Sequence, residues 1–447
     1  QIAAVSAFTT LMHAVSSNTV DIMLAVLLIV GGVVGAQIGT HWGARLRAEQ
    51  LRVLLALLVL AVCGKLALDL FLFFFFWEMM LVPMYFLIAL WGHSSSDGKK
   101  TRIYAATKFF IFTQASGLIM LVAIIALVLV NYGATGVLTF DYEDLLQLQL
   151  DPKLEYLLML GFFIAFAIKA PMVPVHTWLP DTAEQATAGA SSLLVGLLDK
   201  IGTFGMLRLC LGLFPAASDW ATPFVLTLAI ISVLWGAMMA ATSSDLMRFV
   251  SYTSVSHFGF MVIGIFALTT TSITGSIFYM FNHGFSTAAL FLVLGFLVRR
   301  GGTAKVDGYG GVQKVAPVLA GTFLFAGLAT LSLPGTGNFV SEFMALAGAW
   351  SRHPIYVAIS TIGMVLAAVY VLVTYRRTMT GPVQGVSEQV SDLNGREKLV
   401  LAPLIILLLV FGFFPRPMLH AIEPAATATM TQVHATDPAP VVKEGLK

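Results

Sequence analysis

The sequence predicts an all-α polytopic membrane protein with about twelve transmembrane helices. Charged residues make up only 11% of its 447 residues, and hydrophobic residues make up 58%. A soluble domain usually carries roughly 25% charged residues. Apolar runs of about 20 residues, the length needed to cross a bilayer, recur along the whole chain, without the alternation of a membrane β-strand. These observations exclude a cytosolic enzyme, a nucleic-acid-binding protein and a disordered tail.

The apolar runs and the loops between them give the order of the spans. The predicted spans are residues 20–40, 51–69, 70–91, 105–131, 154–177, 184–212, 222–242, 247–269, 272–298, 316–349, 354–376 and 397–420. Most lysines and arginines fall in alternate loops, whereas the main loop on the other side is acidic and holds Asp141, Glu143 and Asp144. Basic loops face the cytoplasm, so this pattern predicts the orientation.

Two of the predicted spans contain helix breakers. Pro171 and Pro174 follow Lys169 in KAPMVPVHTWLP, and Pro334 and Gly335 interrupt the tenth span in LPGTGNFVSEF. A proline removes a backbone donor and clashes with the preceding turn. Broken helices at corresponding places are typical of repeated transporter folds, although a proline kink is also tolerated in membrane helices. We expect two five-helix inverted repeats, each with its break in the fourth helix.

These features divide the chain into five parts. The expected parts are an atypical two-helix segment at 1–69, a first proton-channel half at 70–215, a second at 222–378, a final transmembrane helix at 379–421 and a C-terminal tail at 422–447.

Titratable residues inside the spans are the candidate functional residues. A charge in the membrane interior costs at least about 2.5–3.5 kcal/mol, so each one requires a reason. Six groups on different helices lie at a similar depth, counted at about 1.5 Å per residue. They form a row in the membrane plane, which suits lateral proton relay better than a pore. The candidates are Glu78, Lys169, Lys200, His257, His283 and Glu342.

The two helix breaks suggest how the ends of the row work. Lys169 lies at the C-terminal end of a half-helix, where the helix dipole favours a cation. Glu342 follows Asn338, a predicted N-cap, so that the dipole favours an anion there. We expect Glu78 and Lys169 to form a pair that exchanges a proton as it opens or closes.

Structural roles are the alternatives for these residues. Glu78 and Lys169 would then form a simple ion pair, and the two histidines would only hydrogen-bond across helix interfaces. Asp199 precedes Lys200, but adjacent residues on a helix point apart and do not pair simply.

The sequence indicates no cofactor in this chain. Cys63 and Cys210 lie in apolar runs without a second cysteine at ligand spacing, and no nucleotide-binding motif or metal-ligand spacing occurs. Any energy source must therefore lie in a partner subunit or in an ion gradient.

Several long phrases resemble subunit M of respiratory NADH:quinone oxidoreductase, the antiporter-like membrane subunit of complex I. The resemblance runs from about residue 70 to 417 and includes FLFFFFWEMMLVPMYF, FFIAFAIKAPMVPVHTWLPD, SYTSVSHFGF, NHGFSTAALF and LPGTGNFVSEF. By motif match, Glu78 resembles the family's key glutamate, Lys169 and Lys200 its two lysines, His257 and His283 its connecting histidines and Glu342 its terminal acid.

The resemblance implies a function, partners and a location. It implies a proton-translocating subunit of the enzyme complex in the bacterial plasma (inner) membrane, without a redox centre of its own. NADH, FMN, iron–sulfur clusters and quinone are then expected in partner subunits. The expected partners are the other membrane subunits of the complex, neighbouring antiporter-like subunits among them, the lipid bilayer and protons.

The sequence departs from the family at two places. The family usually has about fourteen spans, whereas residues 1–69 resemble the C-terminal end of a sulfite-exporter-type permease. Asp199 stands where many relatives are apolar. Two alternatives follow: a subunit of a multi-subunit cation/proton antiporter, or a nonfunctional truncated or mosaic chain. The phrases WEMM and NFVSEF favour the NADH:quinone oxidoreductase subunit over the antiporter subunit.

Overall fold

A computed structural model describes residues 47–63, 69–94 and 101–439. The predicted span at 20–40 lies outside the described residues, as does the end of the span at 51–69. Within the described ranges the chain is helical, and the only β-type pairing is two isolated bridges, Asp69 with Asp141 and Asp245 with Lys305. This confirms the all-α prediction.

The helices follow the predicted order. They are α3 (Ala48–Cys63), α4 (Leu70–Met79), α5 (Leu81–Trp91), α6 (Arg102–Thr135), α7 (Tyr142–Leu146), α8 (Pro152–Lys169), α9 (Trp178–Gln185), α10 (Ala188–Leu193), α11 (Lys200–Gly205), α12 (Leu211–Leu213), α13 (Pro215–Thr242), α14 (Leu246–Phe266), α15 (Thr270–Gly301), α16 (Val312–Val315), α17 (Pro317–Thr330), α18 (Gly337–Trp350), α19 (Pro354–Met379), α20 (Gly395–Phe413) and α21 (Arg416–Gln432).

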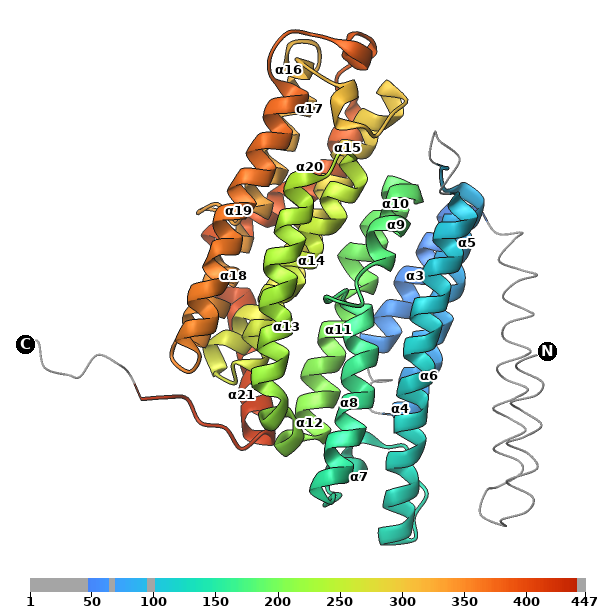
Figure 1. Ribbon diagram of the computed structural model, residues 1–447, viewed down its shortest axis with the longest axis vertical. Helices are drawn as coiled ribbons and strands as arrows, with labels where there is room; N and C mark the ends of the chain where they lie inside the picture. Colours follow the sequence, from blue (N-terminus) through green and yellow to red (C-terminus); the bar gives the residue numbers. More distant parts are fainter. Residues whose placement is uncertain (1–46, 64–68, 95–100, 440–447) are drawn as a thin grey trace, which may run out of the picture.

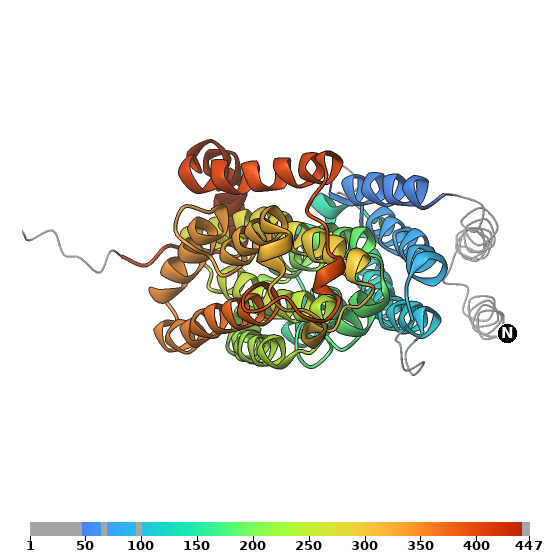
Figure 2. The same cartoon turned by 90° about the horizontal axis from the view of Figure 1, so that it is seen from above.

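The long helices run side by side along the long axis of the molecule (Figure 1). The first helices, α3 to α6, form one side, α17 to α19 form the other, and α13 and α14 lie between them. Seen from above, the C-terminal helices, drawn in red, lie along one edge of the bundle (Figure 2). The acidic loop at α7 and the basic loop at α16 lie at opposite ends, as the loop charges predict.

Some of the predicted spans in the described ranges are not single long helices. Within the described ranges, six helices are long and apolar enough to cross a membrane, or seven if the bent pair α20–α21 is one span. The six are Leu70–Trp91, Arg102–Thr135, Pro215–Thr242, Leu246–Phe266, Thr270–Gly301 and Pro354–Met379. The predicted spans 154–177 and 316–349 are broken near prolines and glycines, and the span 184–212 consists of short α-helices joined by π-helical turns.

Helix α14 forms the centre of the bundle. Its apolar stretch is completely buried, whereas the same stretches of α6 and α19 are less than half buried. The outward faces of these two helices carry exposed apolar side chains such as Val122 and Ile355. Such faces suit contact with lipid or with other membrane subunits, because they need no water.

The first predicted break follows α8. Ala170 has left the helical conformation, as the residue before a proline tends to do, and Pro171 cannot continue the ladder. The indole N–H of Trp178, the first residue of α9, donates to the Ile168 carbonyl at 2.9 Å. This bond satisfies a carbonyl that the helix end leaves without a partner.

The second predicted break lies between α17 and α18. Gly335 has φ of 97° there, a conformation that only glycine adopts easily. Ser332 also has a positive φ of 62°, which is uncommon for a residue with a side chain. The prediction of Asn338 as an N-cap is wrong: the cap position is Thr336, and Asn338 is the second residue of α18.

The last predicted span is not one straight helix. Helices α20 and α21 are bent by 76° at a short break before Arg416. Phe414 has left the helical conformation at this break, as the residue before a proline tends to do, and Pro415 is the N-cap of α21. Helix α21 continues to Gln432, so the boundary expected at 421 falls inside it.

Candidate functional site

Three of the predicted residues meet between α11, α14 and α15. The Lys200 ammonium Nζ lies 2.6 Å from Nδ1 of His283 and donates to the Val195 carbonyl at 2.8 Å. It also lies 4.6 Å from the ring centre of Phe258 on α14. The rings of His283 and His257 follow, with their centres 5.3 Å apart. The structure thus brings Lys200, His283 and His257 into one sequence of contacts.

Tyr279 links the histidines to Glu342. His257 Nδ1 lies 2.6 Å from the Tyr279 hydroxyl, which donates a short hydrogen bond to the Glu342 carboxylate. The carboxylate also accepts a bond of 2.8 Å from the Ser332 hydroxyl and lies 3.8 Å from His257 Nδ1. The Tyr370 hydroxyl lies 3.2 Å from the other ring nitrogen, His257 Nε2. Each polar end of this group therefore has a partner.

Helix α15 and the second break position this stretch. Tyr279 and His283 are four residues apart, so they lie on the same face of α15. Asn282, which precedes His283 on the same helix, donates to the Gly337 carbonyl at 3.0 Å and so fixes the start of α18. Asn338 donates to the Ser286 hydroxyl at 2.9 Å instead of capping its own helix. The breaker sequence thus places Glu342 against Tyr279.

The other two predicted residues lie apart from this stretch. Lys169 is fully buried and its Nζ has no hydrogen-bond partner; it lies 4.9 Å from the centre of the Trp77 ring. In the described part of the chain, no ion pair within 4.0 Å joins Lys169 to Glu78. The two side chains thus do not touch in this structure, and Trp77 lies beside the lysine.

Glu78 lies in a tight space between α4 and α6. A Cβ atom added at Gly117 of α6 would overlap the Glu78 carboxylate, so a larger residue there would force the glutamate side chain to move. That oxygen is buried and has no hydrogen-bond partner. The carboxylate interacts with the Gln114 side chain and, at longer range, with Lys169.

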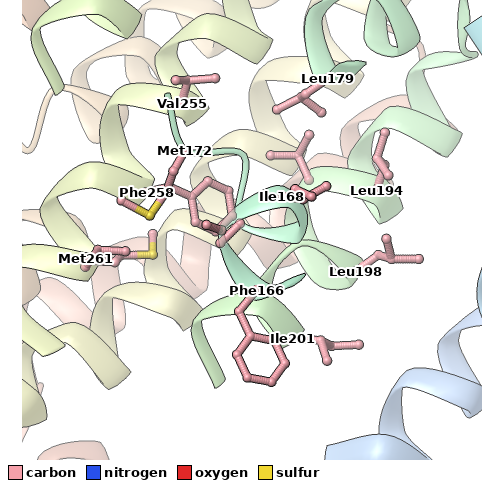
Figure 3. Packing of buried hydrophobic residues seen from close by; sticks show 14 of the residues in the cluster. Phe166, Ile168, Met172, Leu179, Leu194, Leu198, Ile201, Val255, Phe258 and Met261 are labelled. Atoms are coloured by element: carbon pink, nitrogen blue, oxygen red, sulfur yellow. The ribbon is translucent and has the colours of Figure 1, made fainter. Parts of the chain in front are cut away.

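Apolar side chains surround the end of α8 where Lys169 lies. Figure 3 shows Phe166 and Ile168 of α8 facing Leu198, just before α11, and Ile201 of α11. Phe258 of α14 lies on the other side. These residues are buried. A charge in such surroundings interacts strongly with the few polar groups nearby, because no water screens it.

A cluster of four charged residues lies on the basic side. Arg248 binds Asp181 at 2.5 Å and Glu184 at 2.8 Å, and Lys108 binds Asp181 at 2.7 Å. The cluster joins α6, α9 and α14, and so fixes α9, the helix after the first break. A cleft of about 1620 Å³ opens beside it and is also lined by Arg299, among other basic residues.

Sequence reasoning missed the hydroxyl groups of the row. Tyr279, Tyr370 and Ser332 bind His257 or Glu342 directly, yet none is charged and so none was singled out. The spacing of Tyr279 and His283 on one helix face was the available signal. No sequence pattern indicates Tyr370, because its contact joins α14 to the distant α19.

A metal site does not contribute to this arrangement in the described ranges. There, no group of three or more histidine, cysteine, aspartate or glutamate side chains is placed to hold a metal ion. The row consists of proton donors and acceptors only.

Comparisons with known proteins place this geometry in a family. The family model for NADH:quinone oxidoreductase/Mrp antiporter transmembrane subunits matches residues 67–369. NADH-quinone oxidoreductase subunit M of Pseudomonas aeruginosa is 52% identical over 354 residues, which are 79% of this chain and 69% of that protein. The chain belongs to the subunit M family of NADH:quinone oxidoreductase. The resemblance noted in its sequence is thereby confirmed.

Other subunit M proteins and solved structures agree. Subunit M of Mycobacterium tuberculosis is 47% identical over 90% of this chain and 73% of its own length, so the likeness includes part of residues 1–69. A chain of respiratory complex I from Thermus thermophilus with bound NADH matches with a TM-score of 0.75, at 30% identity, over 86% of this chain and 83% of that chain. A chain of the Mrp complex from Dietzia has the same fold, with a TM-score of 0.71 at 23% identity, over 85% and 79%. The subunit M chain is a multi-pass inner-membrane protein.

Proposed function

We propose that this chain moves protons through the row of buried groups, driven by electron transfer from NADH to quinone in partner subunits. The observation that carries the proposal is the sequence of contacts from Lys200 through His283, His257 and Tyr279 to Glu342. Ionisable residues inside a membrane are rare and mark proton or ion pathways. Here three protonatable side chains follow one another from Lys200 to His257, in a bundle whose central helix is buried.

The contacts suggest how a proton passes along this stretch. An ammonium hydrogen of Lys200 transfers to His283 Nδ1, so one N–H bond breaks and another forms. An N–H bond of the His283 ring then breaks and an N–H bond forms on the His257 ring, whose centre lies 5.3 Å away. At the far end, the Nδ1–H of His257 transfers to the Tyr279 oxygen while the tyrosine hydrogen transfers to Glu342. No electron moves in any step, and the net change is one proton displaced.

The buried groups of the row would be divided between two proton channels. Residues 70–215 would hold the first proton channel, with Glu78 and Lys169, and residues 222–378 the second, with the histidines and Glu342. Lys200 would join the two. The electron carriers NADH, FMN, iron–sulfur clusters and quinone would belong to partner subunits, and neighbouring antiporter-like subunits would pack against the apolar outer faces.

Replacing Lys169 by alanine tests the proposal. We expect the rate of NADH-driven proton uptake to fall at least about tenfold, since positioned proton-transfer groups typically contribute 10²–10⁴-fold. The chain would be produced in a bacterial host that lacks its own subunit M, and uptake measured in inverted membrane vesicles. Glu78→Ala is expected to behave in the same way.

Matched variants make this result interpretable. Lys153 is an exposed lysine in the first turn of the same helix, and Lys153→Ala should leave uptake unchanged. NADH oxidation by a water-soluble acceptor reports electron input independently. An assembled Lys169→Ala complex with full proton uptake would refute the proposal. Exchange driven by a sodium gradient without NADH would instead favour a cation/proton antiporter.

A further inference from the structure

Asp199 is a buried carboxylate that the row described above does not use. Its side chain is fully buried, and neither carboxylate oxygen has a hydrogen-bond partner. Burying a charged group without hydrogen bonds is costly, and a membrane interior adds to the cost. A residue of this kind needs a reason, and the reason depends on which groups lie around it.

The helix that carries Asp199 directs it and Lys200 to different neighbours. Successive residues of a helix point about 100° apart, because a turn has 3.6 residues. Lys200 is directed to His283, which it contacts at 2.6 Å. Asp199 interacts electrostatically with Lys169 as well as with Lys200. Asp199 therefore interacts with two lysines that do not contact each other.

Local backbone structure brings this segment close to Lys169. A turn of π-helix, Leu194–Leu198, ends immediately before Asp199. Such turns are rare in proteins, and many of those that occur lie at functional sites. One turn later, a Cβ atom added at Gly202 would lie 2.6 Å from the backbone nitrogen of Ala170, the residue after Lys169. The glycine thus lets the two backbones approach where both charged residues lie.

The row has a gap at this point. From Lys200 to Glu342 the groups follow one another in direct or near contact, but Lys169 Nζ has no hydrogen-bond partner. Asp199 directly precedes Lys200, and its segment packs against the backbone of Ala170, the residue after Lys169. Asp199 is therefore a buried carboxylate on a segment that approaches both lysines, and its oxygens have no other partner in the described ranges.

We propose that Asp199 is a further proton-relay group that connects Lys169 with Lys200 and so joins the two halves of the row. This inference rests on the proposed function. An N–H bond of the Lys169 ammonium breaks as an O–H bond forms on the Asp199 carboxylate. That O–H bond then breaks as an N–H bond forms on the neutral Lys200 amine. One proton moves from the first lysine to the second, and no oxidant or reductant is needed.

The test replaces Asp199 by asparagine, which keeps the size of the side chain but replaces the carboxylate by an amide that does not take up the proton. We expect the rate of NADH-driven proton uptake per assembled complex to fall at least about threefold, and Asp199→Glu to restore at least about half of it. Glu155 provides a matched control, because it is a buried carboxylate whose contact is structural: it accepts from the Ala217 N–H at 2.9 Å. Glu155→Gln should leave uptake per assembled complex unchanged.

The outcomes separate this inference from the proposed function. Full uptake in Asp199→Asn, with Lys169→Ala inactive in the same vesicles, would overturn only the role of Asp199. Full uptake in Lys169→Ala would overturn the proposed function itself. If Asp199→Asn fails to assemble, Asp199→Leu takes its place, since Leu198 and Ile201 make the surroundings apolar. Uptake at the wild-type rate in that variant would equally refute the relay role.

Discussion

Replacing Lys200 by methionine is expected to lower the rate of NADH-driven proton uptake at least about tenfold. Methionine has a similar length but cannot carry a proton. The change removes the group that contacts His283 Nδ1 at 2.6 Å, and so separates the histidines from the rest of the row. The measurement is the initial rate of proton uptake in vesicles, divided by the amount of assembled complex.

Two controls accompany this variant. Lys153→Met makes the same change at an exposed position of α8 and should leave uptake unaltered. Electron transfer from NADH to a water-soluble acceptor should be equal in all vesicles. Wild-type uptake in an assembled Lys200→Met complex would show that Lys200 only fills space beside Phe258.

Replacing Arg248 by leucine is expected to have the largest effect on stability. Arg248 joins Asp181 and Glu184, and its loss leaves these two buried carboxylates with one cation fewer. Removing one partner of a buried ion pair typically costs about 3–5 kcal/mol. Because the Arg248 side chain is 22% exposed, we expect a loss near the lower end, about 3 kcal/mol. The measurement is the temperature at which the chain is lost from the purified complex.

A surface pair provides the comparison for Arg248. Arg377 forms an ion pair with Asp307, but both side chains are exposed. Exposed pairs contribute roughly 0–1 kcal/mol, so Arg377→Leu should barely change the temperature of dissociation. Equal effects of the two variants would mean that the cluster on α9 does not hold the broken helix in place.

The sequence predicted much of this arrangement, because charges in a membrane are rare and stand out. Lys200, His257, His283 and Glu342 were all chosen from depth alone, and the contacts bring them together. Both helix breaks were likewise predicted, from Pro171 and Pro174 and from Pro334 and Gly335, since a proline removes a backbone donor and clashes with the preceding turn.

What the sequence could not predict depends on contacts between distant helices. The pairing of Glu78 with Lys169 was expected from position, but the side chain beside the lysine is Trp77. Asn338 is of a residue type that often caps a helix, yet its side chain binds Ser286 of another helix. The places where spans break or bend depend on such contacts too, because a membrane helix can do so when neighbouring helices satisfy the freed backbone groups.

The central claim is that the buried groups form one relay, and a pair of variants tests it most directly. The initial rate of NADH-driven proton uptake would be measured for Lys200→Met, Glu342→Gln and the double variant, each divided by the amount of assembled complex. Groups that act as one unit are strongly non-additive. A single relay therefore predicts that the double variant retains about the rate of the slower single variant. Losses that multiply would contradict it, because Lys200 and Glu342 would then act on separate paths.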